Sequence, residues 1–298
     1  MDFFKYIHAV GTGAKGNRDL TFEEAQDMMR QILQQSVYPE QIAAFLLGWR
    51  LKPETNEEFR GALSACDGYI KKVKIENSIE LGYPFDGKAK NPYIFPLVAQ
   101  ILKDSKLNVV VVGDELQPAK NGITSKEICT HIKLSENCHF FDRKDFFPEL
   151  HKLSELRMKL GLRTGLSTIE KLPHVAGSEY AITGVFHKPY VKKYVEIFSD
   201  RYKRFALLQG NEGTPELFSK GRLWVTNESG IEEFIIDPEY YGIKYKKSWE
   251  IISLEESLSQ LNSPSDEYMK LAKLNAAIYL FVAQKANSID EAFEILNG

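Results

Sequence analysis

The chain has 298 residues, of which 43% are hydrophobic, 12% aromatic and 27% charged. This composition is typical of a folded globular protein and excludes a disordered or fibrous chain. The formal net charge of −3 argues against a protein that binds polyanions over its whole surface. No charged-then-apolar leader opens the sequence and no apolar run approaches membrane-spanning length, so we expect no membrane partner.

The cysteines indicate the cellular compartment, and the distribution of charge indicates which part of the chain could bind an anionic partner. Cys66, Cys129 and Cys138 form no CxxC pair, and an odd number without a secretory leader predicts free thiols in a reducing cytoplasm. The six histidines lie apart without an HExxH motif, so no metal site is predicted. Residues 228–298 carry 13 acids and 6 bases, whereas the preceding residues carry 32 bases and 28 acids. This asymmetry permits a local basic surface.

The glycine-rich stretch "HAVGTGAKGNRDLTFEEAQ" (8–26) raises the question of a phosphate-binding loop near the start of the chain. Phosphate loops follow a strand and open a helix, and no strand pattern precedes these glycines. We therefore interpret the stretch as a flexible lead-in to the first capped helix. Lys15 and Arg18 remain candidates for phosphate contact as surface charges.

The first 75 residues show only helical patterns. Thr21 and Glu24 form one capping box, and Thr55 and Glu58 form a second that opens a helix ending near Lys71. Between them, "QIAAFLLGWR" is almost entirely apolar. Because such a helix in a small helical domain needs additional cover, we predict a homodimer through the N-terminal helices.

The pattern then changes to alternating strands and helices, which predicts an α/β domain with a mainly parallel sheet. "RLWVTN" and "EEFIID" predict a peripheral strand pair. The predicted buried strands are 107–114, 179–186 and 204–210, and the predicted helices are 92–104, 124–132, 188–199, about 264–285 and a short one from 288.

Three segments resemble one family. "LTFEEAQDMMRQILQQSVYPEQIAAFLLGWRLKPETNEEFRGALSA" (20–65) is similar to the N-terminal helical domain of anthranilate phosphoribosyltransferases and their class-3 glycosyltransferase relatives. "RMKLGLRTGLSTIEKL" (157–172) resembles a later helical segment, and "AITGVFHKPYV" with "LLQGNEGTPEL" resembles the strands that follow. The resemblance implies a small all-helical domain at 1–75, joined by helices near 150–175, and a larger α/β domain at 76–298.

The sequence departs from these enzymes at three motifs. A Gly-Thr-Gly-Gly-type turn for the pyrophosphate of phosphoribosyl pyrophosphate is replaced by "LGYPFDGKAKNPYIF" (81–95). The Lys-His-Gly-Asn-Arg segment after the second strand is absent from "VVVGDELQPAKNG" (110–122). The Asp-Glu pair for magnesium is replaced by "GNEGTPEL" (210–217), which carries Glu212 and Glu216 but no adjacent acidic pair.

The altered motifs resemble a second branch of the family, whose dimeric members lack those signatures and bind nucleic acid in basic grooves. Its lead-in, turn and strand end are similar to "GTGAKGNRDL", "DGKAKN" and "QGNEGT" here. Our leading hypothesis is therefore a non-catalytic or weakly catalytic protein that binds single-stranded nucleic acid, without cofactor. The alternatives are an active pentosyl transferase, using phosphoribosyl pyrophosphate and magnesium, and a structural or regulatory partner protein.

Basic residues in three further places are candidates for phosphate contact, and for each group ordinary solvated surface charge is the competing interpretation. No catalytic residue is assigned, and His187 is interpreted as a turn histidine. Tyr190 and Tyr194 are interleaved with the last group, as in a groove that stacks bases. The candidates are Lys88 and Lys90 in the strand-end turn, Arg157 and Arg163 in the later helical segment, and Lys188, Lys192 and Lys193 on the predicted helix 188–199.

Overall fold

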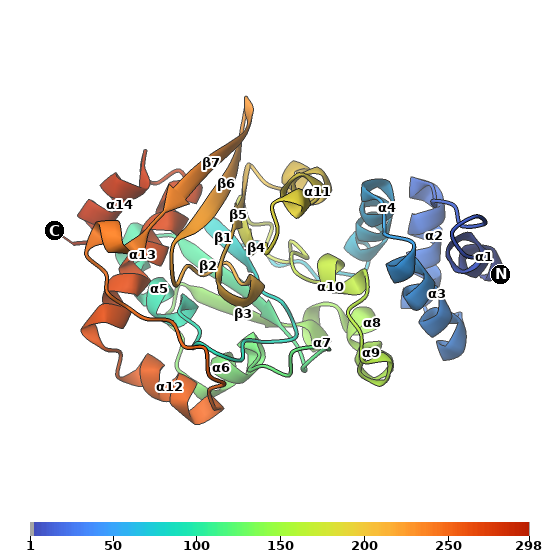
Figure 1. The fold of residues 1–298 in the computed structure, drawn as a ribbon, viewed down its shortest axis with the longest axis horizontal. Helices are drawn as coiled ribbons and strands as arrows, with labels where there is room; N and C mark the ends of the chain where they lie inside the picture. The colour runs from blue at the N-terminus through green and yellow to red at the C-terminus, as the bar shows by residue number, and fades with distance from the viewer. Residues whose placement is uncertain (1–2, 298) are drawn as a thin grey trace.

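The structure is a computed structural model that describes residues 3–297. A helical domain at one end of the molecule contains the first four helices (Figure 1). It is followed by an α/β domain, and the two lie side by side along the long axis. The helices of the first domain are α1 (Phe4–Gly11), α2 (Phe22–Leu33), α3 (Pro39–Leu51) and α4 (Asn56–Asp67).

Both predicted capping boxes are present. The Thr21 hydroxyl accepts the Glu24 N–H at 3.2 Å and the Thr55 hydroxyl accepts the Glu58 N–H at 3.1 Å, with each glutamate reaching back to its cap. Glu58 is also fully buried, where it accepts from Leu20 N–H and the indole of Trp49. One carboxylate thus caps α4 and ties α3 to the segment before α2.

The interpretation of residues 8–20 as a flexible lead-in is wrong for its first part. Residues 8–11 belong to α1 (Phe4–Gly11), because Tyr6, Ala9 and Val10 recur at helical spacing and are buried within the helical domain. The glycines that follow form an ordered turn, in which Thr12 N–H donates to the Asn17 side chain at 2.9 Å.

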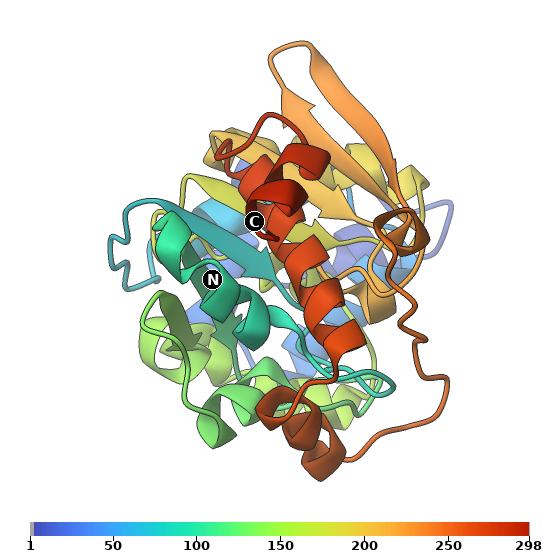
Figure 2. The same ribbon diagram turned by 90° about the vertical axis from the view of Figure 1, so that its left-hand side faces the viewer.

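The sheet contains seven strands in the order β3-β2-β1-β4-β5-β6-β7. The first five pair in parallel, whereas β6 and β7 form an antiparallel hairpin that projects from the sheet (Figures 1 and 2). The mainly parallel sheet is therefore confirmed, as is the peripheral strand pair. The strands are β1 (Ser78–Gly82), β2 (Asn108–Gly113), β3 (Cys138–Asp142), β4 (Tyr180–Gly184), β5 (Arg204–Leu208), β6 (Gly221–Asn227) and β7 (Gly230–Ile236).

Strand register places alternate residues in two separate cores. Ile79 aligns with Val109 and Tyr180 and faces one side of the sheet. Val110 and Ala181 face the other side, toward the helical domain. Because side chains alternate along a strand, the β-branched runs fill both faces, as expected for a buried parallel sheet.

The helices of the α/β domain cover these two faces. Helix α13 (Asp266–Val282) crosses one face beside α5 (Phe95–Ile101) (Figure 2), whereas α11 (Pro189–Phe198) packs on the other. The remaining α-helices are α6 (Ser125–His131), α7 (Arg143–Phe146), α8 (Pro148–His151), α9 (Ser154–Leu160), α10 (Leu166–Ile169), α12 (Leu254–Asn262) and α14 (Ile289–Ile295). Short 3₁₀ turns occupy Lys103–Ser105, Ser199–Arg201, Asn211–Gly213 and Pro238–Tyr241.

The helices near 150–175 lie against the helical domain, since α9 contacts α3 and α10 contacts α4. One face of α3 is covered within the chain, because Ile42, Phe45, Leu46 and Trp49 are buried, whereas Leu47 is 41% exposed. Leu51, at the end of α3, remains 73% exposed, and the homodimer stays a prediction.

Two general expectations concern the whole chain. The three cysteines have free thiols, as predicted. Within residues 3–297, none of the helices combines the length and the apolar character that a membrane span requires. The cytoplasmic location stays a prediction.

We predict that the buried carboxyl of Glu80 makes stability depend on pH. Glu80 accepts from the Tyr202 hydroxyl at 2.9 Å and from His174 N–H at 3.0 Å, and burial raises its pKa to about 7. Because the folded pKa exceeds the unfolded one, this group's stability contribution is fully present below the unfolded pKa and is lost as pH rises toward 7. Between pH 5 and 8, wild-type stability should fall by about 2 kcal/mol relative to Glu80→Gln.

Chemical denaturation of both proteins at several pH values measures this difference. Glu76→Gln, at an exposed position shortly before β1, is the matched control and should follow the wild type. Parallel curves for the wild type and Glu80→Gln would contradict the assignment.

Candidate functional site

A cleft of about 360 Å³ opens between the helical domain and the carboxyl ends of the parallel strands. Ligands of open parallel sheets bind at this edge, where loops from several strands meet. The helical domain contributes Arg50, Glu54 and Phe59. The sheet contributes the turn after β1, the loop after β4 and the loop after β5, and α11 forms one wall. The cleft therefore uses both domains.

Aromatic rings and cations dominate the cleft wall. The guanidinium of Arg163 and the ammonium of Lys171 lie among the rings, and Lys171 sits 5.2 Å from the ring centre of Tyr194. Burial raises the pKa of the Glu54 carboxyl above its usual range. Such a wall suits a planar, partly anionic ligand. The rings are those of Phe59, Phe85, Phe186, His187, Tyr190 and Tyr194, and the cations are Arg50, Arg163, Lys171 and Lys193.

Asp86, which lines the cleft, pairs with the cleft residue Arg163 and with Lys120. Its nearly buried carboxylate accepts from Arg163 Nε at 2.9 Å, and the Lys120 ammonium lies 3.4 Å from its other oxygen. Burial lowers the pKa of Lys120. The Arg163 side chain is still 43% exposed, so it is fixed by Asp86 while remaining accessible to a ligand.

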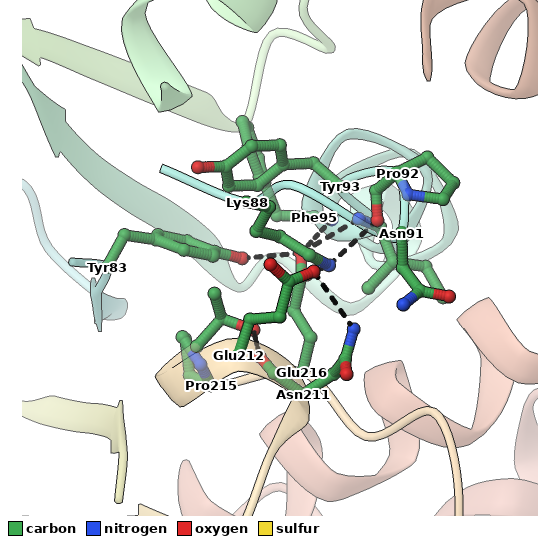
Figure 3. A network of polar contacts seen from close by, with 12 residues as sticks. Tyr83, Lys88, Asn91, Pro92, Tyr93, Phe95, Asn211, Glu212, Pro215 and Glu216 are labelled. Atoms are coloured by element: carbon green, nitrogen blue, oxygen red, sulfur yellow. Dashed lines mark hydrogen bonds and ion pairs between the residues drawn. The ribbon is translucent and has the colours of Figure 1, made fainter. Parts of the chain in front are cut away.

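The strand-end turn places Lys88 inside the protein. Its ammonium contacts Glu216 at 2.5 Å and the Pro92 carbonyl at 2.8 Å, and the residue is fully buried (Figure 3). Burial lowers the pKa of Lys88. The prediction that Lys88 offers its charge to a phosphate is therefore corrected. Gly87 allows the turn, because its φ is +76° and a Cβ would lie 2.4 Å from the Gly122 carbonyl group.

Glu212 and Glu216, the acids of the segment that replaces the family's magnesium-binding Asp-Glu pair, already accept hydrogen bonds from other groups of the protein. Glu216 also accepts from the Tyr83 hydroxyl at 2.7 Å and from Ile94 N–H at 2.8 Å (Figure 3). Glu212 accepts from the N–H groups of Ala89 at 2.7 Å and Lys90 at 3.0 Å.

Across residues 3–297, no cluster of three or more His, Cys, Asp or Glu side chains suits a metal ion. The arrangement of Glu212 and Glu216 in this structure does not fit magnesium. Each carboxylate is oriented toward N–H or O–H donors instead of toward an open coordination site.

Arg157 belongs to a buried ion-pair network and not to a ligand surface. Its guanidinium binds Glu170, which also pairs with Arg143, and Arg143 pairs with Asp114. The arginines hold the pKa of the Glu170 carboxyl below its usual range despite its burial. The structure therefore favours the alternative of a structural ion pair for Arg157.

The other predicted cations are dispersed. Lys188 pairs with Glu233 at 2.7 Å, and Lys192 lies 3.7 Å from Glu196. Lys90 lies 5.6 Å from the centre of the Trp249 ring, outside the cleft. Lys15 and Arg18 belong to the helical domain, where Arg18 pairs with Glu24.

Of the nine predicted phosphate contacts, the cleft thus brings together Arg163 and Lys193. It adds Arg50 and Lys171, which the sequence analysis did not select. Both lie in segments that carry the family resemblance, Arg50 in α3 and Lys171 just after α10, but neither stands in a basic cluster of the sequence. They line one cleft because the segment with α9 and α10 packs against α3 and α4 of the helical domain.

We predict that Lys88→Met destabilises the protein by about 3 kcal/mol, because it leaves the buried Glu216 carboxylate without its cation. Adding Glu216→Gln should recover part of this loss. Lys90→Met is the matched control and should change stability by less than about 0.5 kcal/mol. Denaturant unfolding of the wild type and the three variants measures these values, and equal effects of Lys88→Met and Lys90→Met would refute the buried pair.

Comparison with known proteins agrees with this architecture. Residues 5–67 match the helical bundle domain of a glycosyl transferase family, and residues 122–297 match the a/b domain of that family. An uncharacterized protein of Aquifex aeolicus is 28% identical, with 98% of this chain and 97% of the relative covered. An anthranilate phosphoribosyltransferase of the same organism is 25% identical, with 93% and 88% covered.

Solved structures show the same fold. Anthranilate phosphoribosyltransferase from Thermus thermophilus superposes with a TM-score of 0.77 at 19% identity, covering 99% of this chain and 93% of that one. The enzyme from Saccharomyces cerevisiae, in complex with PRPP and Mg, gives 0.79 at 14% identity, covering 99% and 92%. With the helical bundle and most of the α/β domain matched, this chain belongs to the glycosyl transferase family of anthranilate phosphoribosyltransferase-like proteins.

Proposed function

We propose that this protein is a pentosyl transferase that moves a phosphoribosyl group from phosphoribosyl pyrophosphate to an aromatic acceptor bound in the cleft. The observation that carries the proposal is the cleft itself, a pocket of rings and cations at the carboxyl ends of the strands. Relatives named anthranilate phosphoribosyltransferase align over more than nine-tenths of the chain, which supports this chemistry over nucleic-acid binding.

Arg163 is the residue we assign to the acceptor. A guanidinium fixed on one side by Asp86 presents its remaining N–H groups in a planar fork that suits a carboxylate or a ring carbonyl. Phe186 and Tyr190 line the same cleft and are 50% and 46% exposed, so their rings are available for contact with a flat acceptor ring. Arg163 would thus orient the acceptor without taking part in bond exchange.

Carboxylates of the cleft suit the charge that develops in such a transfer. Loss of pyrophosphate from the sugar leaves positive charge on the ribose ring in the transition state. Glu54 and Asp86 line the cleft and would place negative charge near a sugar bound there, Glu54 when its carboxyl is ionised and Asp86 in addition to its pairs with Arg163 and Lys120. The acceptor nitrogen forms the new bond as the bond to pyrophosphate breaks. We assign no general base.

We predict that Arg163→Ala raises the acceptor KM by tenfold or more, because one charge-assisted contact contributes about 1.5–3 kcal/mol. Pyrophosphate release from phosphoribosyl pyrophosphate, with magnesium chloride and a panel of anthranilate and nucleobases, measures the reaction. Lys192→Ala, at an 85% exposed side chain outside the cleft, is the control. Melting temperatures check that Arg163→Ala remains folded.

Absence of acceptor-dependent release across the panel would overturn the transferase proposal. Release that is insensitive to Arg163→Ala would overturn the role of Arg163 alone. The two outcomes are separated because the first concerns the wild-type protein.

A second candidate function, binding of single-stranded nucleic acid, rests on one face of α11. Lys188 and Lys192 are both exposed there, whereas Tyr190, two residues from each and therefore on a different face, is 46% exposed and lines the cleft. Exposed rings near lysines can stack bases while the ammonium groups contact phosphates. The acidic partners Glu233 and Glu196 weaken this charge, which is why we place it second.

On this second hypothesis, Lys188→Ala with Lys192→Ala should weaken oligonucleotide binding and flatten its dependence on salt by about 0.7 per lost phosphate contact. Gel-shift titrations of a labelled oligonucleotide at two salt concentrations measure both effects. Lys144→Ala with Lys152→Ala, at exposed positions away from α11, is the charge-matched control. Binding that is absent, or insensitive to salt, would eliminate the hypothesis.

A further inference from the structure

We infer that the turn Lys88–Lys90 is an oxyanion-binding site that the protein closes with its own Glu212 side chain. The ligand class is a phosphate or pyrophosphate group, which must displace the Glu212 carboxylate to enter. The inference deepens the proposed function and rests on it, because the turn follows Asp86, which lines the cleft together with Glu212, and would hold the donor.

The geometry of the contact is that of a bound anion. The two Glu212 oxygens accept separately from the successive N–H groups of Ala89 and Lys90, at 2.7 and 3.0 Å. Successive backbone N–H groups in a turn form a concave site for anions. The Asn211 side-chain amide makes a longer contact of 3.5 Å with the same carboxylate. The main partners of Glu212 are therefore groups that would serve a phosphate equally well.

The surrounding charges also favour an anion once Glu212 leaves. Lys88, Lys120 and Arg163 form ion pairs around this turn, and their carboxylate partners there are Asp86 and Glu216. Three cations face two anions, and Glu212 supplies the third negative charge. Removing it would leave a net positive site lined by two free amide donors.

The loop that carries Glu212 is held in a conformation that depends on this contact. Glu212 has φ 54° and ψ 23°, in the left-handed region that a residue with a Cβ rarely adopts. Such a conformation persists only where surrounding contacts fix it. The contacts here include the two turn amides and Lys120, which donates to the Glu212 carbonyl at 2.8 Å, besides hydrogen bonds of Asn211 with Glu216 and Thr214 at the ends of the loop. Release of the carboxylate would remove part of that restraint.

The arrangement implies a closed resting state. Glu212 and Gly213 line the cleft, so the closing group lies where a ligand in the cleft would meet it. Lys88 and Glu216 stay buried beneath the turn in either state, because their mutual pairing does not involve Glu212. Only the loop 210–214 has to move.

Calorimetry with inorganic pyrophosphate, without donor or acceptor, tests the inference. We expect Glu212→Ala to bind pyrophosphate at least tenfold more tightly than the wild type. Glu212→Gln should show a smaller gain, because the neutral amide oxygen competes less well for the two N–H groups. Glu228→Ala, which removes the same charge from the exposed β6–β7 turn, should match the wild type.

Hydrogen exchange supplies a second measurement. The amides in residues 86–92 should exchange faster in Glu212→Ala than in the wild type, and pyrophosphate should protect them again. Equal pyrophosphate affinity, or no binding, in the wild type and every folded Glu212 variant would overturn the inference. If Glu212→Ala does not fold, Glu212→Gln decides.

The outcomes also separate this inference from the proposed transferase. Tighter pyrophosphate binding by Glu212→Ala without transfer to any acceptor would support the closed site and reject the enzyme. Transfer by the wild type, with unchanged pyrophosphate affinity in the variants, would support the enzyme and reject the closed site.

Discussion

The buried pair of Lys88 and Glu216 is the interaction on which the cleft depends. Glu216 accepts from a lysine, a tyrosine and two backbone N–H groups, so its charge is compensated although no part of the side chain is exposed. A buried ion pair is tolerated only with such complete satisfaction. In consequence, the turn after β1, the start of α5 and the loop after β5 are joined at one point.

That junction determines which groups the turn offers to the cleft. Because the Lys88 side chain points inward, the turn presents backbone N–H groups in place of an ammonium. Glu212 occupies those groups. Asp86 is likewise occupied by partners within the protein, because its carboxylate pairs with Arg163 and Lys120. The charged groups at this side of the cleft are thus paired with one another, and Arg163 remains partly exposed. Which ligands bind then depends on which of these contacts a ligand can displace.

The chain keeps the family's fold where its sequence motifs have changed. Residues 68–121 lie outside both matched family segments, and they contain β1, the altered turn and β2. These strands still pair in parallel with β4 and β3, since their apolar alternation is intact. Packing of the fold requires only apolar residues at the correct period, whereas phosphate recognition requires particular groups at particular positions. Phosphate recognition can therefore change while the fold is retained.

Local signals in the sequence determined most of the helices and strands. Capping boxes mark α2 and α4, and apolar runs mark β2, β4 and β5, because both signals depend only on residues close together in the sequence. Strand β3, with the short segment "CHFFD", and helix α12 were missed, since β3 shows no apolar run and lies at the sheet edge. Only the tertiary structure determined which charged side chains are exposed and which are buried in ion pairs. Lys88 meets Glu216 across 128 residues of chain, and no local pattern states whether a lysine will face water or a distant carboxylate.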